Sequence, residues 1–188
     1  MVPSIEELSA NLRSVSDEQD ANAAVALLLK VEGGRPYILF VKRVQNSSDP
    51  WSGQIALPGG KRESKDKDLK ETVIRETLEE TKINLHGNCR FLGVMSALQS
   101  KPRPEIKVLP FVILVGDAPS IRLNEKELEE YFWIPFDELV RDRTYSKFSF
   151  GKVPAFIVGN KIIWGLTYRI IESFVHCYQK GTQLGNSN

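Results

Sequence analysis

Residues 58–83 of this chain read PGGKRESKDKDLKETVIRETLEETKI. Apolar residues in this stretch recur at helical spacing, so we predict an amphipathic helix over residues 68–82 that buries Leu69, Val73 and Ile74. A glycine pair precedes the helix and ends a short apolar run that has the length of a strand. Strand, sharp turn and amphipathic helix together indicate an α/β domain.

Three glutamates of the predicted helix, Glu76, Glu79 and Glu80, stand at positions i, i+3 and i+4 and so share one face. Their charges repel one another unless a cation lies among them, and such hard oxygen ligands suit Mg²⁺ or Mn²⁺. Gly60 allows a close backbone approach to a ligand, and Arg75 is placed to orient the carboxylates. Glutamates at this spacing often form a solvated surface, but their coupling to a strand ending in LPGG favours a site.

The order Gly-x5-acid-x8-Arg-Glu-x-x-Glu-Glu resembles the signature motif of the Nudix family, the Nudix box, over residues 60–83. The resemblance implies a pyrophosphohydrolase dependent on Mg²⁺ or Mn²⁺. It also implies the Nudix fold, an α/β architecture in which helices sandwich a mixed β-sheet (α/β/α). The implied metal ligands are Gly60, Glu76, Glu79 and Glu80, and the implied catalytic residues include Glu79, Glu76 and Arg75.

Three positions depart from the usual box. The first acid is Asp66 instead of glutamate, one extra residue separates it from Arg75, and Lys82 stands where the box usually has glycine. The first two departures resemble the coenzyme A diphosphatase branch of the family, and a cation at residue 82 suits the helix dipole. We expect Asp66 to lie in the outer coordination shell of the metal.

Two further segments resemble the same branch: IIWGLTYRII at 162–171 and RVQNSSDPWSGQIALPGG at 43–60. The second segment lacks one expected arginine, carries one inserted residue and has Leu57 in place of the usual phenylalanine. The resemblance makes coenzyme A or a derivative the leading substrate. ADP-ribose, other dinucleotides and nucleoside triphosphates stay open, because substrate contacts lie on variable loops.

Several residues outside the helix are candidates for catalysis or substrate binding. Glu79 is one choice of general base, but in related enzymes the base can come from a loop before the last strands. NEKELEE at 124–130 offers Glu125 and Glu127 there, unless both are plain solvated charges. The candidates for substrate binding are Arg43, Lys61 and Arg62 as phosphate ligands or surface cations, and Trp51 as a base-stacking ring or a loop anchor. We assign Trp164 and Tyr168 to core packing.

The whole chain, residues 1–188, is expected to form a single Nudix domain. A short N-terminal helix over residues 4–14, with a capping box at Ser4 and Glu7, precedes it. A frayed tail is expected at 181–188. Between them we predict strands at 23–31, 36–44, 54–58, 91–98, 106–115 and 131–134, a helical turn after Pro135, a hairpin at 155–165 and a helix at 166–180.

Bulk composition excludes several classes of protein. A net charge of +1, from 25 basic and 24 acidic residues, argues against nucleic acid or an anionic membrane as a partner. The polar start and the absence of a long apolar run argue against export and membrane insertion. We therefore expect a cytoplasmic protein that binds a small nucleotide, and the resemblance is compatible with a homodimer. A Nudix-fold binding module is the alternative, but such modules generally lack a box acid, and this chain keeps all three.

Overall fold

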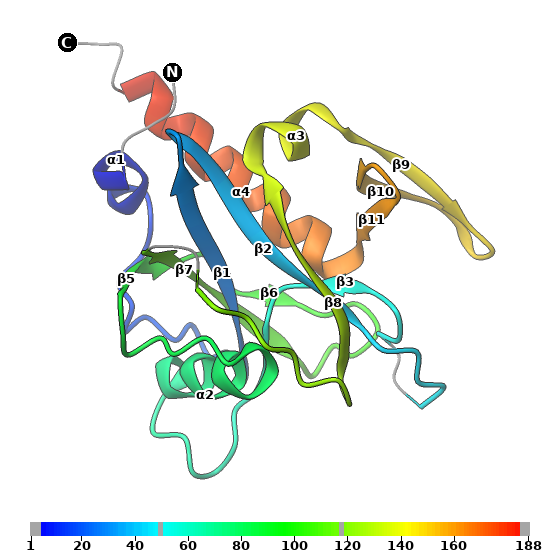
Figure 1. The fold of residues 1–188 in the computed structure, drawn as a ribbon, viewed down its shortest axis with the longest axis horizontal. Coiled ribbons are helices and arrows are strands. Elements are labelled where there is room, and N and C mark those ends of the chain that lie inside the picture. Colours follow the sequence, from blue (N-terminus) through cyan, green and yellow to red (C-terminus); the bar gives the residue numbers. More distant parts are fainter. Residues whose placement is uncertain (1–4, 49–50, 117–118, 185–188) are drawn as a thin grey trace.

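The computed structural model describes residues 5–48, 51–116 and 119–184, which form two sheets and four helices (Figure 1). The first half of the chain holds α1 (Ile5–Ala10), β1 (Ala23–Glu32), β2 (Arg35–Arg43), β3 (Ile55–Ala56), β4 (Gly59–Lys61), α2 (Leu69–Thr81) and β5 (Cys89–Val94). The second half holds β6 (Leu98–Gln99), β7 (Lys107–Val115), β8 (Leu128–Pro135), α3 (Phe136–Arg141), β9 (Arg143–Phe148), β10 (Gly151–Val158), β11 (Lys161–Trp164) and α4 (Gly165–Leu184).

Strand β1 organises the larger sheet, which has eight strands among the described residues. It pairs antiparallel with β2 and β4 and parallel with β7, from Ala23 beside Val108 to Leu29 beside Leu114. The remaining pairs, which join β2 to β3 and β8 and β7 to β5 and β6, are antiparallel. The sheet is therefore mixed, as the sequence predicts.

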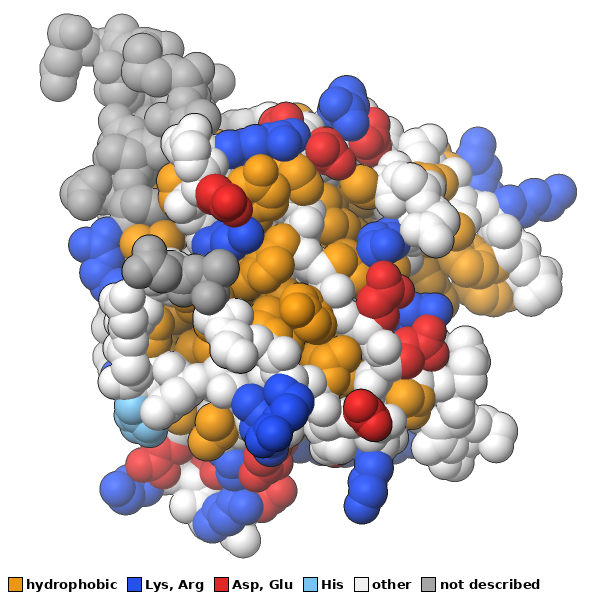
Figure 2. Space-filling model, in the orientation of Figure 1, with side chains coloured by type: hydrophobic (Ala, Val, Ile, Leu, Met, Phe, Trp, Pro, Cys, Tyr) orange, Lys and Arg blue, Asp and Glu red, His pale blue; other side chains and the backbone are white. Residues whose placement is uncertain are grey.

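Helices cover both faces of this sheet because successive β1 side chains point to opposite sides. Ala26 and Leu28 face the cluster that contains Leu69 and Val73 of α2. The β1 side chains that alternate with these, such as Leu27, point to the other face of the sheet. There they pack in a second cluster, which contains apolar residues of α1, α3 and α4. The α/β/α sandwich is confirmed. Figure 2 shows hydrophobic side chains gathered over the middle of the face that carries β1 and β2, with charged side chains around them.

The N-terminal helix ends at Ala10 and not at residue 14 as predicted. After the helix the chain is extended at Arg13, because Arg13 pairs with Val94 of β5. The Arg13 amide donates to the Val94 carbonyl oxygen (2.9 Å), and the Val94 amide donates to the Arg13 carbonyl oxygen (3.0 Å). Leu8 of this helix is buried in the apolar core. The predicted capping residue Ser4 lies outside the described residues.

A second, three-stranded sheet of β9, β10 and β11 follows α3. The predicted hairpin at 155–165 is present as β10 and β11, which turn at Gly159 and Asn160. Strand β9 is not among the predicted elements, since its sequence RTYSKF is largely polar and only Ser146 is buried. The β9–β10 hairpin extends from the side of the molecule (Figure 1).

The last helix continues beyond its predicted end. Residues 181–184, predicted as part of a frayed tail, belong to α4, and residues 185–188 lie outside the described part. One glycine inside a helix costs only about 1 kcal/mol, so Gly181 does not end it. No described helix is both long enough and apolar enough to cross a membrane.

Candidate active site

Helix α2 is anchored at its first turn and along its buried face by its own sequence. The Asp68 side chain caps the first turn by accepting from the Glu71 amide (2.7 Å), and the Glu71 carboxylate accepts in return from the Lys67 amide (2.8 Å). Leu69 and Val73 are fully buried against the sheet. Anchoring at this end and along the buried face turns the acidic residues of the helix toward β4.

Lys82 ends α2 in a left-handed conformation, with φ 62° and ψ 12°. This conformation costs a side-chain-bearing residue about 1 kcal/mol, which explains why the box usually has glycine here. We expect Lys82→Gly to raise the free energy of unfolding by about 1 kcal/mol in urea titrations. Lys82→Ala keeps the Cβ atom and serves as the control, and an equal gain in both variants would contradict the backbone explanation.

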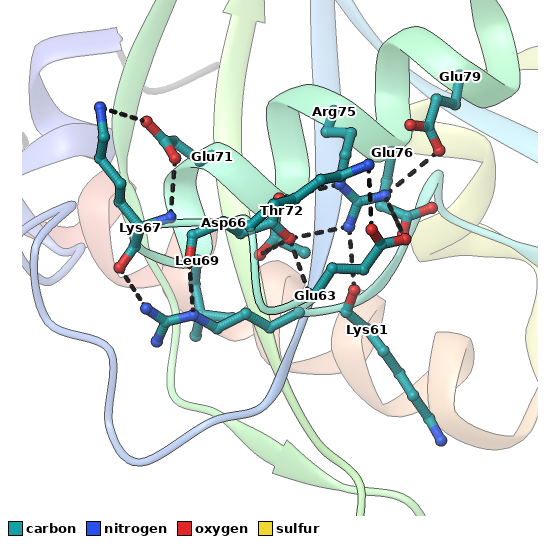
Figure 3. Close-up of polar contacts among 12 residues, drawn as sticks. Lys61, Glu63, Asp66, Lys67, Leu69, Glu71, Thr72, Arg75, Glu76 and Glu79 are labelled. Atoms are coloured by element: carbon teal, nitrogen blue, oxygen red, sulfur yellow. Dashed lines mark hydrogen bonds and ion pairs between the residues drawn. The ribbon is translucent and has the colours of Figure 1, made fainter.

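Asp66 and Arg75 form a buried ion pair beneath the loop that leads into α2 (Figure 3). Arg75 Nε and Nη2 donate to the two Asp66 carboxylate oxygens at 3.0 and 2.9 Å, and Asp66 also accepts from the Glu63 amide and the Thr72 hydroxyl. The hydrogen bonds from Arg75 hold the pKa of Asp66 well below its usual range. Protein donors thus contact both Asp66 oxygens, so Asp66 positions Arg75, and its outer-shell role stays a prediction.

The other side of the Arg75 guanidinium reaches the face of α2 that carries Glu76, Glu79 and Glu80, which we call the acidic face. Its Nη1 atom donates to Glu76 Oε1 (2.8 Å) and Glu79 Oε2 (3.3 Å) (Figure 3). Glu80 points inward and accepts from the Gly59 amide at 2.9 Å. The three predicted metal ligands of the helix therefore differ in exposure: Glu79 is exposed, Glu76 half-buried and Glu80 buried.

Burial leaves the negative charge of Glu80 poorly compensated. It raises the pKa of Glu80 to about 8, and the charges of Glu76 and Glu127 add to the rise, whereas the Gly59 amide and Arg43 oppose it. Burial also raises the pKa of Glu76, against the effect of Arg75. A site with several half-satisfied carboxylates is suited to a divalent cation.

The described residues contain no group of three metal-binding side chains gathered around one point. Each helix glutamate is instead drawn to a protein donor, either Arg75 or the Gly59 amide. The oxygen donor set and its excess negative charge nevertheless fit a hard divalent ion. Glu76, Glu79, Glu80 and the backbone of Gly60 are the groups that would hold it.

Gly59 and Gly60 form strand β4, whereas the sequence predicted a turn that ends a strand. They pair with Val25 and Ala24 of β1, and a Cβ atom on Gly59 would lie 2.2 Å from the Ala24 carbonyl oxygen. Gly59 also has a φ of +147°, which side-chain-bearing residues rarely adopt. The glycine pair thus lets the backbone fit between β1 and α2.

A methyl group on Gly60 would collide with the carboxylate of Glu76, whose Cδ atom lies 2.5 Å from the ideal Cβ position. We expect Gly60→Ala to fold normally, because the end of a flexible side chain can move aside. We expect kcat to fall roughly 10- to 100-fold, because the carboxylate is displaced. Gly87→Ala is the control: Gly87 has no positive φ, and its Cβ would lie at an ordinary contact distance, 3.4 Å, from the Asn84 carbonyl oxygen. Full activity in Gly60→Ala would contradict the placement of Glu76.

A cavity of about 230 Å³ beside β4 brings together three of the four predicted substrate-binding residues, Arg43, Trp51 and Lys61. Trp51 also packs against a small apolar cluster and lies under the Arg103 guanidinium, 5.8 Å from its ring centre. Both interpretations of Trp51, as loop anchor and as stacking surface, are compatible with this position.

Arg62 does not line this cavity. Its guanidinium donates to the backbone carbonyl oxygens of Asp66 and Lys67 and lies 3.5 Å from the Glu18 carboxylate. Arg62 therefore stabilises the loop before α2, and the structure does not bring it together with Arg43 and Lys61 at the cavity.

Segment 122–128 lies along the end of α2 and places Glu127 opposite the helix glutamates. The Asn124 amide donates to the Glu80 carbonyl oxygen (2.9 Å), and the Asn124 side chain donates to Glu127 Oε1 (2.7 Å). The negative charge of Glu127 raises the pKa of both Glu76 and Glu80, which places its carboxylate near the acidic face. Glu125 and Glu127 are both exposed, but only Glu127 is among the main charges acting on these two carboxyls.

The two aromatic residues predicted to pack in the core differ. Tyr168 is buried, as predicted. Trp164 is only half-buried and lines a second cavity next to the first. Residues of the β9–β10 hairpin, which the sequence did not single out, line the same cavity. The only signal for them is the spacing of the aromatic residues Phe148 and Phe150, which does not show what they face.

Comparison with known proteins agrees with this geometry. The family model of the NUDIX domain matches residues 20–153. Mouse mitochondrial coenzyme A diphosphatase NUDT8 is 30% identical over 173 residues, which are 87% of this chain and 79% of that protein. The uncharacterized protein C14C4.10c of Schizosaccharomyces pombe is 36% identical over 110 residues, 56% of this chain but only 33% of that protein.

Among solved structures, the NUDIX domain of Shewanella oneidensis NrtR, in complex with ADP ribose, superposes with a TM-score of 0.55. It is 14% identical, and the match covers 83% of this chain and 86% of that one, so it shows the fold alone. Family model and relatives agree on the family, and the solved structure agrees on the fold. The chain belongs to the Nudix family of pyrophosphohydrolases.

Proposed function

We propose that this enzyme hydrolyses, with Mg²⁺, the pyrophosphate bond of a nucleoside diphosphate linked to another group, and that coenzyme A or a derivative is its substrate. The observation that carries the reaction is the acidic face of α2, next to a cavity lined by the cations Arg43 and Lys61. The name of the mouse relative and the segments 43–60 and 162–171 support the choice of coenzyme A.

Nudix hydrolases use divalent metal ions, and we propose Mg²⁺, with Mn²⁺ as the alternative, held by Glu76, Glu79, Glu80 and Gly60. Such an ion neutralises phosphate oxygens and lowers the pKa of a bound water. Arg75 holds the glutamate carboxylates in place through its hydrogen bonds. These contacts keep the acidic face assembled for the substrate.

Arg43 and Lys61 would offset the charge of the pyrophosphate, which otherwise repels a nucleophile. Water attacks one phosphorus atom in line with the bridging oxygen, so one P–O bond forms as the bridging P–O bond breaks. Glu127 accepts the proton that the water loses, since its carboxylate faces the acidic face of α2. The second phosphate leaves with the bridging oxygen.

We expect Glu127→Gln to lower kcat about 100-fold with little change in KM, because the amide cannot accept the proton. Glu125→Gln is the matched control, two residues away on the same loop, and should keep full activity because Glu125 is not among the charges that act on Glu76 and Glu80. Steady-state kinetics at several pH values would check both variants. Equal, small effects would remove Glu127 from the mechanism and leave Glu79 as the general base.

Incubation with Mg²⁺ and a panel of coenzyme A, ADP-ribose, NADH, diadenosine polyphosphates and nucleoside triphosphates tests the substrate, with products resolved by chromatography. Formation of 3′,5′-ADP and phosphopantetheine from coenzyme A is the expected result. Preference for another nucleotide would keep the reaction and overturn the substrate. Binding without cleavage of any compound would favour a non-enzymatic nucleotide-binding module.

We propose a small-molecule nucleotide as the partner, without nucleic acid, and a homodimer as the assembly. The proposed location is the cytoplasm, supported by Cys89 and Cys177, both described and neither in a disulfide. The mouse relative is named as mitochondrial, so cell fractionation with detection of this protein decides between the two compartments.

A further inference from the structure

A second cavity, of about 510 Å³, adjoins the substrate cavity. The two share the lining residues Trp51, Gln54 and Leu166, so they form one continuous depression. We call the second cavity the aromatic groove. The hairpin β9–β10 forms its outer wall, and the start of α4 forms its floor.

Three rings pack together at the outer wall of the aromatic groove. Phe148 and Phe150 stack with ring centres 5.2 Å apart and planes 4° apart, and Trp164 packs against both at 4.7 and 5.6 Å. Phe150 nevertheless stays 65% exposed, although it stands next to other apolar lining residues such as Val153 and Pro154. An apolar surface of this kind beside a substrate site is suited to an apolar ligand group.

The polar side chains that border the groove are largely engaged by the protein itself. Arg169 Nη1 donates to the Gln99 carbonyl oxygen at 2.8 Å, and Glu172 Oε1 accepts from the Tyr168 hydroxyl at 2.9 Å. Lys101 remains as a cation at the rim. A nucleobase or sugar would bring polar edges that need partners along the wall, whereas an aliphatic chain needs none.

We infer that the aromatic groove receives the uncharged, aliphatic end of the substrate, so that the enzyme prefers substrates whose second substituent ends in an acyl chain. The inference rests on the proposed function and adds residues that determine specificity. The bond that breaks lies between the phosphates, so the acyl chain of the substrate is not altered by the reaction. Contacts in the groove thus act on binding and lower KM without raising kcat.

Titration calorimetry of the full chain with a chelator present, so that no metal-dependent cleavage occurs, tests this inference. The ligands are free coenzyme A and its acetyl, butyryl, hexanoyl and octanoyl thioesters. We expect affinity to rise with chain length, by up to roughly fourfold per methylene group. Phe150→Ala should weaken octanoyl binding roughly tenfold and leave free coenzyme A unchanged.

Tyr145→Ala is the matched control, because Tyr145 is 58% exposed on the same hairpin but does not line the groove. It should bind every ligand like the wild type. Affinity independent of chain length, or equal losses in both variants, would overturn the inference. A loss in Phe150→Ala confined to diadenosine polyphosphates would also overturn it, since the groove would then bind a second base.

Kinetics with Mg²⁺ separate this inference from the proposed function. If the wild type cleaves coenzyme A but chain length changes neither KM nor affinity, the function stands and the groove inference fails. If no thioester is cleaved while Phe150-dependent binding rises with chain length, the proposed reaction fails and the binding role of the groove stands.

Discussion

Replacing Glu80 by glutamine should lower kcat roughly 1000-fold or more while the protein still folds. Glu80 is the buried member of the acidic face, and its amide variant would supply no charge to a divalent ion. Metal stabilisation of the transition state is worth several kcal/mol, and about 4 kcal/mol corresponds to this loss. Glu32→Gln, on the exposed end of β1, is the control and should keep full activity.

The same variant should be more stable than the wild type when metal is removed at alkaline pH. The pKa of Glu80 is about 8 in the folded chain and near 4.5 when the carboxyl is unperturbed. The folded state therefore holds the Glu80 proton more tightly than the unfolded state does. The contribution of this proton to the free energy of unfolding is fully present below pH 4.5 and is lost as the pH rises through about 8. Denaturant titrations with a chelator, at pH values across this window, measure the effect.

Glu80→Gln has no such proton to lose, so its stability should change less over this pH window. Added Mg²⁺ should restore wild-type stability at the alkaline end by binding the ionised carboxylates. Parallel curves for wild type and variant would show that Glu80 is already ionised and satisfied in the folded chain.

Arg75→Met should lower the free energy of unfolding by about 3–5 kcal/mol, because it leaves the Asp66 carboxylate buried without its ion pair. The Asp66 side chain is only 4% exposed, so water cannot replace the guanidinium. Thermal and denaturant unfolding would measure the loss. Activity should fall as well, since Glu76 and Glu79 lose their donor.

Two further variants separate charge from geometry at this pair. Arg75→Lys keeps the charge but cannot donate to both Asp66 oxygens in a planar pair, so an intermediate loss is expected. In the double variant with Asp66→Asn, the buried charge is gone, and part of the stability should return. An Arg75→Met protein as stable as wild type would show that Arg75 serves the carboxylates of α2 alone.

Elements with a strong local signal are predictable from this sequence. Helix α2 is predicted over residues 68–82 and found at Leu69–Thr81, because Asp68 caps it and apolar spacing marks its buried face. The hairpin of β1 and β2 follows from two apolar runs around Gly33 and Gly34. Their positive φ values, 58° and 76°, suit a tight hairpin turn.

Features set by tertiary contacts are not predictable in this way. Gly59 and Gly60 have the composition of a turn, and only the presence of β1 makes them a strand. Strand β9 has no apolar pattern of its own and forms by pairing with β10. Likewise, the sequence places Arg62 next to the glycines, but the loop carbonyls that bind its guanidinium are brought there by folding.

The parallel pairing of β1 with β7 also constrains how this protein is made. Ala23 cannot meet its partner Val108 until the ribosome has released more than half of the chain. Until then the apolar strand β1 has only β2 and β4 as sheet partners, and its edge toward β7 lies open to aggregation or to chaperones. Non-local pairing of this kind slows folding, so we expect nascent chains truncated before β7 to depend on chaperones most strongly.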